Sequence, residues 1–410
     1  MPTPTEAPDS RTGRRRFLRF GAALSGALTA CKTTNTAPAE PAETSSLGKP
    51  LTAYGERSPF EKPERLVVSG KNPEIGATRT PLQNSYGIIT PSSLHFERHH
   101  SGVPQIDPAA HRLLIHGMVE RPLIFTMDDI LRLPSVSRIH FIECAGNSGS
   151  EWGPKTAPDV QRAHGLASCS EWTGVPLPIL LAEAGVKPGA SWLIAEGADA
   201  CHMSRSVPLK RVADDVLVAY GQNGEAIRPS QGYPLRLVIP GFEGNTNVKW
   251  LRRIKVVGEP VMTKDETSKY TDLMADGTAR QFTFEMEGKS VITFPSGGQK
   301  LAGAGLYEIA GLAWSGRGRI ERVEISTDDG KTWQNAKLDE PRLRMAFTRF
   351  RLPWKWDGQP SSLQSRSTDE TGYVQPAREA LVAVRGMNSG FHNNCITIWK
   401  VSADGGVTNV

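Results

Sequence analysis

Glycine and proline interrupt this chain throughout its length and constrain its fold more than any other feature. The 410 residues include 40 glycines and 30 prolines. Because both residue types break helices and favour turns, the sequence predicts short strands joined by many turns instead of long helices. We therefore expect an α+β fold that is rich in β structure, and a chain of this length predicts two domains.

The N-terminus predicts export. Arg14, Arg15 and Arg16 precede an apolar run over residues 20–30. This run is shorter than the roughly 20 apolar residues that span a bilayer, so residues 1–31 indicate a signal segment, and the paired arginines favour the Tat route. The sequence that ends at Cys31 resembles a lipobox, so this cysteine is either lipidated or lost with the signal. We expect a periplasmic protein.

The composition changes after the signal. Residues 32–60 are rich in Thr, Ala, Pro, Glu and Ser and lack apolar periodicity, which predicts a linker. We expect a catalytic domain over residues 61–270 and a second domain over residues 285–405. In the second domain we predict strands over residues 309–312, 320–326, 331–334, 381–385 and 396–401, with a hairpin turn at Asp329-Gly330. Short antiparallel strands at this spacing suggest an immunoglobulin-like sandwich.

The net charge gives no reason to expect a nucleic-acid partner. The formal charge is +5, but residues 1–31 hold five arginines against Glu6 and Asp9, a net +3 that leaves +2 for the remainder. A nearly balanced surface does not predict nucleic-acid binding, which requires clustered Lys and Arg.

The five cysteines are widely and irregularly spaced. There is no Cys-x-x-Cys-His sequence, so this chain cannot hold a c-type haem covalently, and any haem must reside on a partner. Cys169 and Cys201 could form a disulfide in an exported protein, or both could be small buried thiols. Spacing alone does not decide between these alternatives.

The chemistry concentrates around Cys144. Residues 138–143 include β-branched and aromatic side chains, which predict a strand. Cys144-Ala145-Gly146-Asn147 follows and predicts a turn. A thiolate at this strand end could be presented to a redox-active metal, because soft sulfur ligands suit such ions. A single cysteine after a strand is more often a buried core residue, so the motif needs support from elsewhere in the chain.

That support is a resemblance to a known family. Glu143-Cys144-Ala145-Gly146-Asn147 resembles the molybdenum-binding loop of the sulfite oxidase family of molybdopterin oxidoreductases, and the resemblance covers roughly residues 80–405. Further segments match in the same order: Phe96, Arg98 and His100; residues 171–175; residues 196–199; residues 206–208; and residues 232–236 with 240–241 and 248–251. The resemblance implies a mixed α/β molybdopterin-binding domain followed by an immunoglobulin-like dimerisation domain.

The resemblance also implies roles for individual residues. Cys144 would ligate molybdenum, with Arg98 and Tyr270 as further catalytic residues. The residues implied to bind the cofactor, besides Cys144, are Phe96, His100, Asp199, Ser206, Arg236 and Lys249. Two of these have a physical reason of their own, because Arg236 and Lys249 are fixed positive charges of the kind that a buried phosphate requires.

Two positions depart from the family pattern. Family sulfite oxidases tend to carry an arginine where this chain has Gly149, and a histidine where it has Gln231. The loss of a positive side chain weakens a pocket for free sulfite, and smaller residues widen its entrance. We therefore expect a bulky sulfur substrate on a carrier protein, as in the sulfane dehydrogenase subfamily of the thiosulfate-oxidising Sox system. Residues 164–172 resemble that subfamily in particular. Arg162 and Arg205 are additional candidates for positive charge near the pocket.

The expected function is molybdenum-dependent oxidation of sulfane sulfur or sulfite by oxo transfer. The resemblance implies that electrons leave to a dihaem c-type cytochrome subunit, and that the protein is a homodimer within a heterotetramer. Trp354, Trp356 and Trp399 could serve the dimer interface or pack in the core. A periplasmic reductase of sulfoxides such as oxidised methionine is the alternative enzyme, and an exported binding protein is the alternative from another class. No His-Glu-x-x-His sequence supports a zinc hydrolase, and His392, Asn393 and Asn394 receive no role.

Overall fold

The computed structural model describes residues 47–212, 215–388 and 390–410, so the predicted signal and the first part of the predicted linker lie outside the described residues. Residues 47–61 belong to a first unit of the chain, contain no helix or strand and are exposed. Residues 62–410 form one compact unit. None of the helices in the described ranges is long and apolar enough to cross a membrane.

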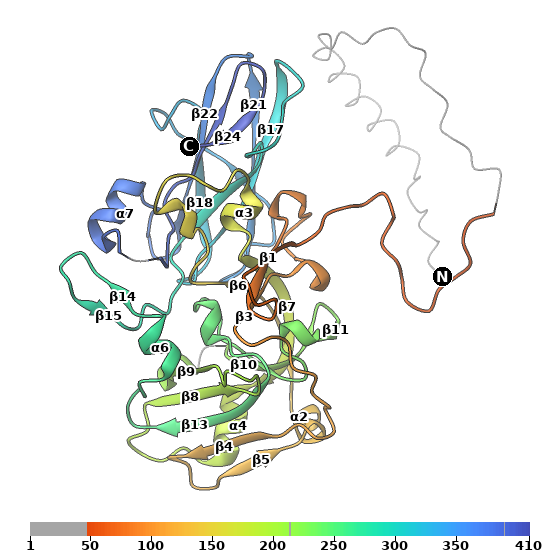
Figure 1. Ribbon diagram of the computed structural model, residues 1–410, viewed down its shortest axis with the longest axis vertical. Helices are drawn as coiled ribbons and strands as arrows, with labels where there is room; N and C mark the ends of the chain where they lie inside the picture. The colour runs from red at the N-terminus through yellow and green to blue at the C-terminus, as the bar shows by residue number, and fades with distance from the viewer. Residues whose placement is uncertain (1–46, 213–214, 389) are drawn as a thin grey trace, which may run out of the picture. The chain divides into compact units, whose positions relative to one another are not determined.

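The N-terminal half of this unit contains three sheets (Figure 1). The first has β1 (Leu66–Ser69), β2 (Gly76–Arg79) and β3 (Glu97–His99). The second has the order β11 (Glu225–Ala226), β10 (Leu217–Gln222), β7 (Ala167–Pro176) and β6 (Val136–Glu143), with β12 (Arg236–Val238) paired to β10. The third has the order β5 (Leu123–Phe125), β4 (Leu113–Gly117), β13 (Leu251–Val257), β8 (Trp192–Gly197) and β9 (Ser204–Pro208).

The helices of the described residues are short, as the glycine and proline content predicts. The α-helices in this part of the chain are α2 (Met127–Arg132), α3 (Val160–His164), α4 (Leu177–Ala184), α5 (Leu209–Val212), α6 (Lys264–Ser268) and α7 (Arg378–Arg385). Single 3₁₀ turns are η1 (Leu82–Asn84), η2 (Ser92–Leu94), η3 (Gly149–Glu151), η4 (Pro229–Gln231) and η5 (Gly244–Thr246). A small hairpin of β14 (Asp272–Leu273) and β15 (Ala279–Arg280) follows α6.

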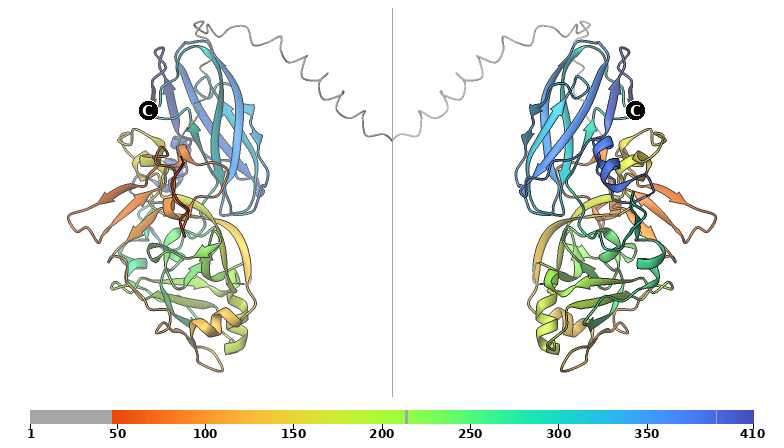
Figure 2. Two further views of the ribbon diagram at one scale, coloured as in Figure 1. Left: turned by 90° about the vertical axis from the view of Figure 1, so that its right-hand side faces the viewer. Right: turned by 90° about the vertical axis from the view of Figure 1, so that its left-hand side faces the viewer.

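The C-terminal half is a sandwich of two antiparallel sheets (Figure 2). One has the order β16 (Lys289–Phe294), β17 (Gly305–Trp314), β21 (Thr348–Trp356) and β20 (Lys337–Leu338). The other has the order β19 (Gln334–Asn335), β18 (Ile320–Ser326), β22 (Ser361–Asp369), β23 (Ile398–Val401) and β24 (Val407–Asn409). Trp356 and Trp399 are buried in the core of the sandwich. Of the two roles considered for these tryptophans, dimer interface or core packing, the structure shows core packing.

Local predictions in the sandwich are confirmed except at two segments. Of the strand predicted over residues 331–334, only Gln334 lies in a strand, β19. Asp329 and Gly330 both have positive φ angles, 66° and 79°, in the turn between β18 and β19, as the hairpin prediction requires. The strand predicted over residues 381–385 is wrong, because these residues end α7. Leu381 and Arg385 are buried four residues apart, so the helix presents one face to the protein, and the short apolar run concealed that period.

The two halves share a hydrophobic core. Phe141 of β6, Val160 of α3 and Cys169 of β7 pack in one cluster with Trp314 and Phe347 of the sandwich. Cys169 and Cys201 are both free thiols, so of the two alternatives for this pair the disulfide is wrong. The shared core fixes the end of β6, and therefore Cys144, against the sandwich.

Candidate active site

A cavity opens where β3, the end of β6 and the segment before β13 meet. Its walls are formed by His95, Phe96, Glu97, Arg98, His99, His100, Ile142, Cys144, Asp199, Met203, Gln231, Arg236, Gly244, Asn245, Asn247, Val248, Lys249, Trp250 and Tyr270. Eight of the nine residues implied by the family resemblance therefore line one cavity.

Cys144 lies at the end of β6, where the chain turns sharply. Its backbone N–H donates to the Leu166 carbonyl at 2.9 Å, and the Asn147 N–H donates to the Cys144 carbonyl at 2.9 Å. Burial raises the pKa of the Cys144 thiol, against the lowering effects of the Gly146 backbone N–H and of Arg98. The free thiol is therefore protonated at neutral pH, and a metal that binds it must displace the proton.

Close packing of a second turn supports the Cys144 turn. A Cβ atom on Gly244, in η5, would lie 3.0 Å from the Glu143 carbonyl oxygen and 3.4 Å from the Cys144 Cα. Gly241, by contrast, has a φ of +79° and approaches the backbone of Gly316 in the sandwich, so only Gly244 of these two glycines faces the cavity. The absence of a side chain at residue 244 thus determines how closely η5 approaches the thiol.

Two cations in the wall lack acidic partners. Arg236 donates to the carbonyls of Gln231 at 2.8 Å and Asn247 at 3.1 Å, while its Nε has no partner among the described residues. Lys249 donates to the Ser230 carbonyl at 3.0 Å and to His99 Nδ1 at 3.0 Å. In the described part of the chain neither cation forms an ion pair. Burial lowers the pKa of Arg236 to about 9, and burial followed by Arg236 lowers that of Lys249 well below its usual value.

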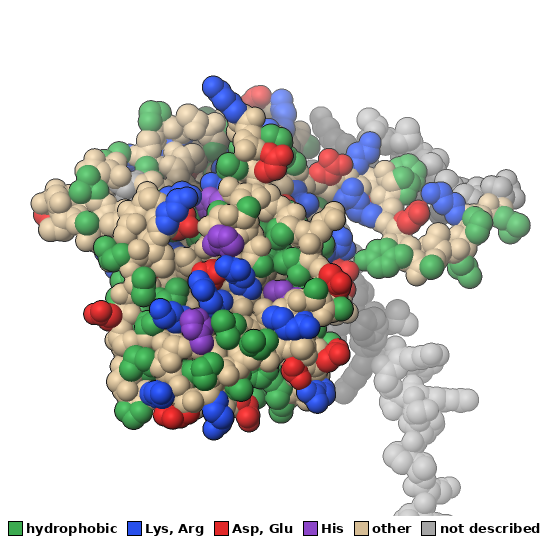
Figure 3. All heavy atoms as spheres, turned by 60° about the horizontal axis from the view of Figure 1, so that its bottom comes forward, with side chains coloured by type: hydrophobic (Ala, Val, Ile, Leu, Met, Phe, Trp, Pro, Cys, Tyr) green, Lys and Arg blue, Asp and Glu red, His purple; other side chains and the backbone are tan. Residues whose placement is uncertain are grey.

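These two cations fit an anionic cofactor. A buried positive charge is costly unless it is paired, so a phosphate placed between Arg236 and Lys249 would compensate both. Positive charge also extends over the surface. On the face drawn in Figure 3, Lys, Arg and His side chains gather near the middle and acidic side chains lie mostly toward the edges. Such a distribution attracts anions.

Arg98 and Tyr270 face the cavity together with Cys144. Arg98 Nη1 donates to the Gly76 carbonyl at 3.1 Å and also to the His99 carbonyl, which fixes the guanidinium in the wall. The Tyr270 hydroxyl lies 3.4 Å from His100 Nε2. Burial, then the nearby Cys144, raises the pKa of Tyr270, so its hydroxyl remains a hydrogen-bond donor across the physiological range.

Family models match both halves of the chain. The oxidoreductase molybdopterin binding domain matches residues 100–264, and the Mo-co oxidoreductase dimerisation domain matches residues 280–399. The chain belongs to the sulfite oxidase family of molybdopterin oxidoreductases. The described halves are therefore the molybdopterin-binding domain and the dimerisation domain of this family, in the predicted order.

Similar proteins include both oxidases and reductases. The crystal structure of the sulfane dehydrogenase SoxCD from Paracoccus pantotrophus contains a chain 49% identical to this one, with a TM-score of 0.87 over 89% of this chain and 96% of that chain. Human mitochondrial sulfite oxidase is 33% identical over 71% of this chain and 56% of its own length. The NADH nitrate reductase of Ulva prolifera is 31% identical over 67% of this chain. The chain spans only 35% of the length of that reductase.

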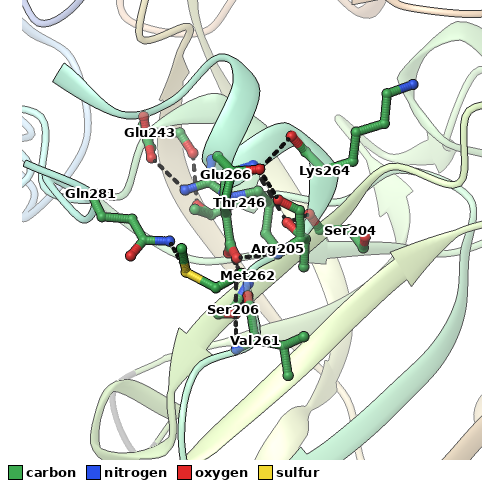
Figure 4. A network of polar contacts seen from close by, with 12 residues as sticks. Ser204, Arg205, Ser206, Glu243, Thr246, Val261, Met262, Lys264, Glu266 and Gln281 are labelled. Atoms are coloured by element: carbon green, nitrogen blue, oxygen red, sulfur yellow. Dashed lines mark hydrogen bonds and ion pairs between the residues drawn. The ribbon is translucent and has the colours of Figure 1, made fainter. Parts of the chain in front are cut away.

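One residue implied to bind the cofactor lies outside the cavity. Ser206 is fully buried, and its hydroxyl donates to Glu266 at 3.1 Å and to the Val261 carbonyl at 3.1 Å (Figure 4). Its neighbour Arg205 is buried between Glu243 at 3.0 Å and Glu266 at 3.4 Å, with its guanidinium 4.9 Å from the centre of the Tyr270 ring. The Arg205 guanidinium therefore packs against the Tyr270 ring. The Ser206 hydroxyl bonds to Glu266 of α6 and not to the cavity.

Of the other three positions considered from the sequence, only Gln231 lines the cavity, whereas Arg162 and Gly149 do not. Arg162 is half-exposed and paired with Asp159, outside the cavity. Gly149 does not line the cavity either, because a Cβ there would point to the Gly390 carbonyl at 3.3 Å. Gln231 does line the cavity: its neutral amide donates to the Phe96 carbonyl at 2.8 Å and accepts from Arg236 Nη1 at 3.3 Å.

Several residues of the site were missed from the sequence. His95 and His99 line the cavity, and burial lowers the pKa of each to about 3, so both imidazoles are neutral. The concentration of histidine at residues 95–100 was the available signal. The sequence provided no reason to assign a role to His392. Its backbone N–H donates to the Ala145 carbonyl at 2.8 Å, and its imidazole Nε2 lies 3.2 Å from Glu243 Oε2. Nothing in the local sequence could connect residues 145 and 392.

Proposed function

We propose that this protein is a periplasmic molybdenum-dependent dehydrogenase that oxidises sulfane sulfur during thiosulfate oxidation. The observation that carries the proposal is the arrangement of one cavity, in which the Cys144 thiol, Arg98 and two uncompensated cations converge. The 49% identity to a chain of a sulfane dehydrogenase structure supports this substrate class over the other activities of the family.

The residues of the cavity would have different roles in metal ligation, cofactor binding and substrate binding. Cys144 would ligate molybdenum, Arg236 and Lys249 would hold the cofactor phosphate, and Asp199, Phe96 and His100 would contact the pterin. When bound, molybdenum–molybdopterin supplies oxygen-atom transfer to low-valent sulfur and takes up two electrons. Arg98 would attract the anionic sulfur group, while the neutral Tyr270 hydroxyl would orient it by donating a hydrogen bond.

The substrate is proposed to be sulfur carried on another protein. Gln231 is neutral, and Arg236 and Lys249 would be engaged with the cofactor phosphate, which leaves Arg98 as the cation of the cavity that would meet the substrate. A single cation is a weak site for a free dianion such as sulfite. The test is turnover by purified enzyme of a carrier protein bearing a cysteine persulfide, compared with free sulfite. Efficient turnover of sulfite alone would contradict the proposal.

Partners and location follow from the same resemblance. We propose export by the Tat pathway, a dihaem SoxD-like cytochrome c subunit as electron acceptor, and a homodimer within a heterotetramer, because this chain has no haem attachment sequence and has a dimerisation domain. Cell fractionation, with mass spectrometry of the mature N-terminus, tests export and the fate of Cys31. Purification from the periplasm tests whether a cytochrome accompanies the chain.

The decisive experiment is metal and pterin analysis of the exported protein beside Cys144→Ser. We expect about one molybdenum for each chain in the wild type and a loss of turnover by at least about 10³-fold in the variant, since a metal ligand is removed. Molybdenum-free wild type, or full turnover by the variant, would overturn the proposal. Activity only with a quinol donor and sulfoxides would favour the alternative, a methionine sulfoxide reductase.

A further inference from the structure

Glu143 precedes Cys144 but turns away from the cavity. Its carboxylate is fully buried at the junction with the sandwich and accepts three hydrogen bonds. Oε1 accepts from Lys289 Nζ at 2.5 Å and from Asn147 Nδ2 at 2.9 Å, and Oε2 accepts from Trp314 Nε1 at 2.7 Å. Two of these donors, Lys289 and Trp314, belong to the dimerisation domain.

Lys289 holds both ends of the Cys144 turn. It begins β16, has an exposed fraction of only 2%, and donates to Glu143 and, at 3.1 Å, to the Ser148 hydroxyl. Residues 143 and 148 flank the turn, so one ammonium group ties its two ends to a strand of the other domain. Ser148 has a φ of 62°, a backbone conformation that a serine adopts only when its surroundings impose it.

We propose that Lys289 is a positioning residue that fixes the Cys144 sulfur for metal ligation from the dimerisation domain. A buried ion pair is weak evidence for stability, because apolar residues of similar volume often stabilise as well. Its value here is geometric, since ligands must be held within about 0.5 Å of the productive arrangement. This inference depends on one part of the proposed function, namely that Cys144 ligates molybdenum.

The position of Lys289 predicts which kinetic constant responds. Lys289 does not line the cavity, so its removal should leave substrate binding unchanged. Moving the thiolate by a fraction of an ångström changes its overlap with the metal, and displacements of about 1 Å in active sites cost on the order of 100-fold in rate. The effect should therefore appear in kcat and in the electronic spectrum of the metal.

The experiment compares molybdenum-loaded wild type, Lys289→Met and the double variant Lys289→Met/Glu143→Gln. Lys300→Met is the matched control, because Lys300 pairs with Asp404 at 3.3 Å on the exposed surface of the same domain. Molybdenum content, the electron paramagnetic resonance spectrum of the Mo(V) state, the melting temperature, kcat and KM are measured for each. Glu143→Gln in the double variant removes the carboxylate that Lys289→Met would otherwise leave buried and unpaired.

We expect both variants to retain molybdenum, to show a shifted Mo(V) spectrum, and to lose about 10- to 100-fold in kcat with KM changed by less than about twofold. The double variant should melt like the wild type yet keep the shifted spectrum, and it tests the role even if Lys289→Met does not fold. A wild-type spectrum and kcat in the double variant would overturn the positioning role. Wild-type protein without any molybdenum signal would instead overturn the proposed function, and this role with it.

Discussion

At the scale of single residues, the site is marked by charges that the protein alone does not compensate. Lys249 is bonded only to neutral groups, namely two carbonyls and His99 Nδ1. Its counter-charge must come from a ligand if the protein is to retain it at low cost. The sequence identified Lys249 and Arg236 through motif order, and their charge gave an independent reason to expect a phosphate.

Lys249→Met should weaken cofactor retention. A charge-assisted hydrogen bond to phosphate contributes about 1.5–3 kcal/mol, so the affinity for the pterin should fall by about 10- to 100-fold. Pterin content after dialysis measures this change. Lys255→Met, an exposed lysine on β13, is the control and should retain the wild-type content. Equal pterin content in both variants would mean that Lys249 does not bind the cofactor.

At the scale of elements, secondary structure could be predicted from the sequence where the residues of one segment determine its conformation. The strand end at Cys144 was predictable because a β-branched and aromatic run is followed there by turn residues. The helix over residues 378–385 was not, because a five-residue apolar window does not separate a helix from a strand. Ser206 lies outside the cavity, which motif order could not indicate, because it does not say which face of a strand points to the cavity.

Gly244→Ala tests the packing of η5 against Cys144. A methyl group there would lie 3.0 Å from the Glu143 carbonyl oxygen, so one of the two turns must move. Overpacking of this kind costs about 1–3 kcal/mol, and we expect a lower melting temperature together with a lower molybdenum content. Gly153→Ala is the control, because nothing lies within 4 Å of its added Cβ. An unchanged molybdenum content in Gly244→Ala would show that the turn tolerates the shift.

At the scale of the whole molecule, the turn that carries Cys144 is held by residues of both domains, and this is what the sequence could least predict. Residues separated by more than 140 positions, such as Glu143 and Lys289 or Ala145 and His392, meet at the junction. Each domain could be recognised from its own motifs and turns. Their contacts depend on side chains whose partners are distant in the sequence, so only the structure reveals them.

The same junction should be sensitive to acid. His164 bridges it, with Nδ1 2.7 Å from the Ser148 hydroxyl and Nε2 3.2 Å from the Thr397 hydroxyl. Burial lowers the pKa of His164 to about 3, against about 6.5 when unfolded. Between these values the unfolded chain binds a proton that the folded protein does not, so stability is present above pH 6.5 and falls as the pH drops toward 3.

The loss from His164 should approach roughly 4 kcal/mol when the pH has fallen to about 3. Melting temperatures measured from pH 7.5 to 4 should therefore decline, and His164→Gln should decline less steeply because it cannot be protonated. His202→Asn, at an exposed histidine, should follow the wild-type curve. If His164→Gln and the wild type lose stability in parallel, acid acts elsewhere in the molecule, and two other buried histidines with a lowered pKa, His95 and His140, become the groups to test.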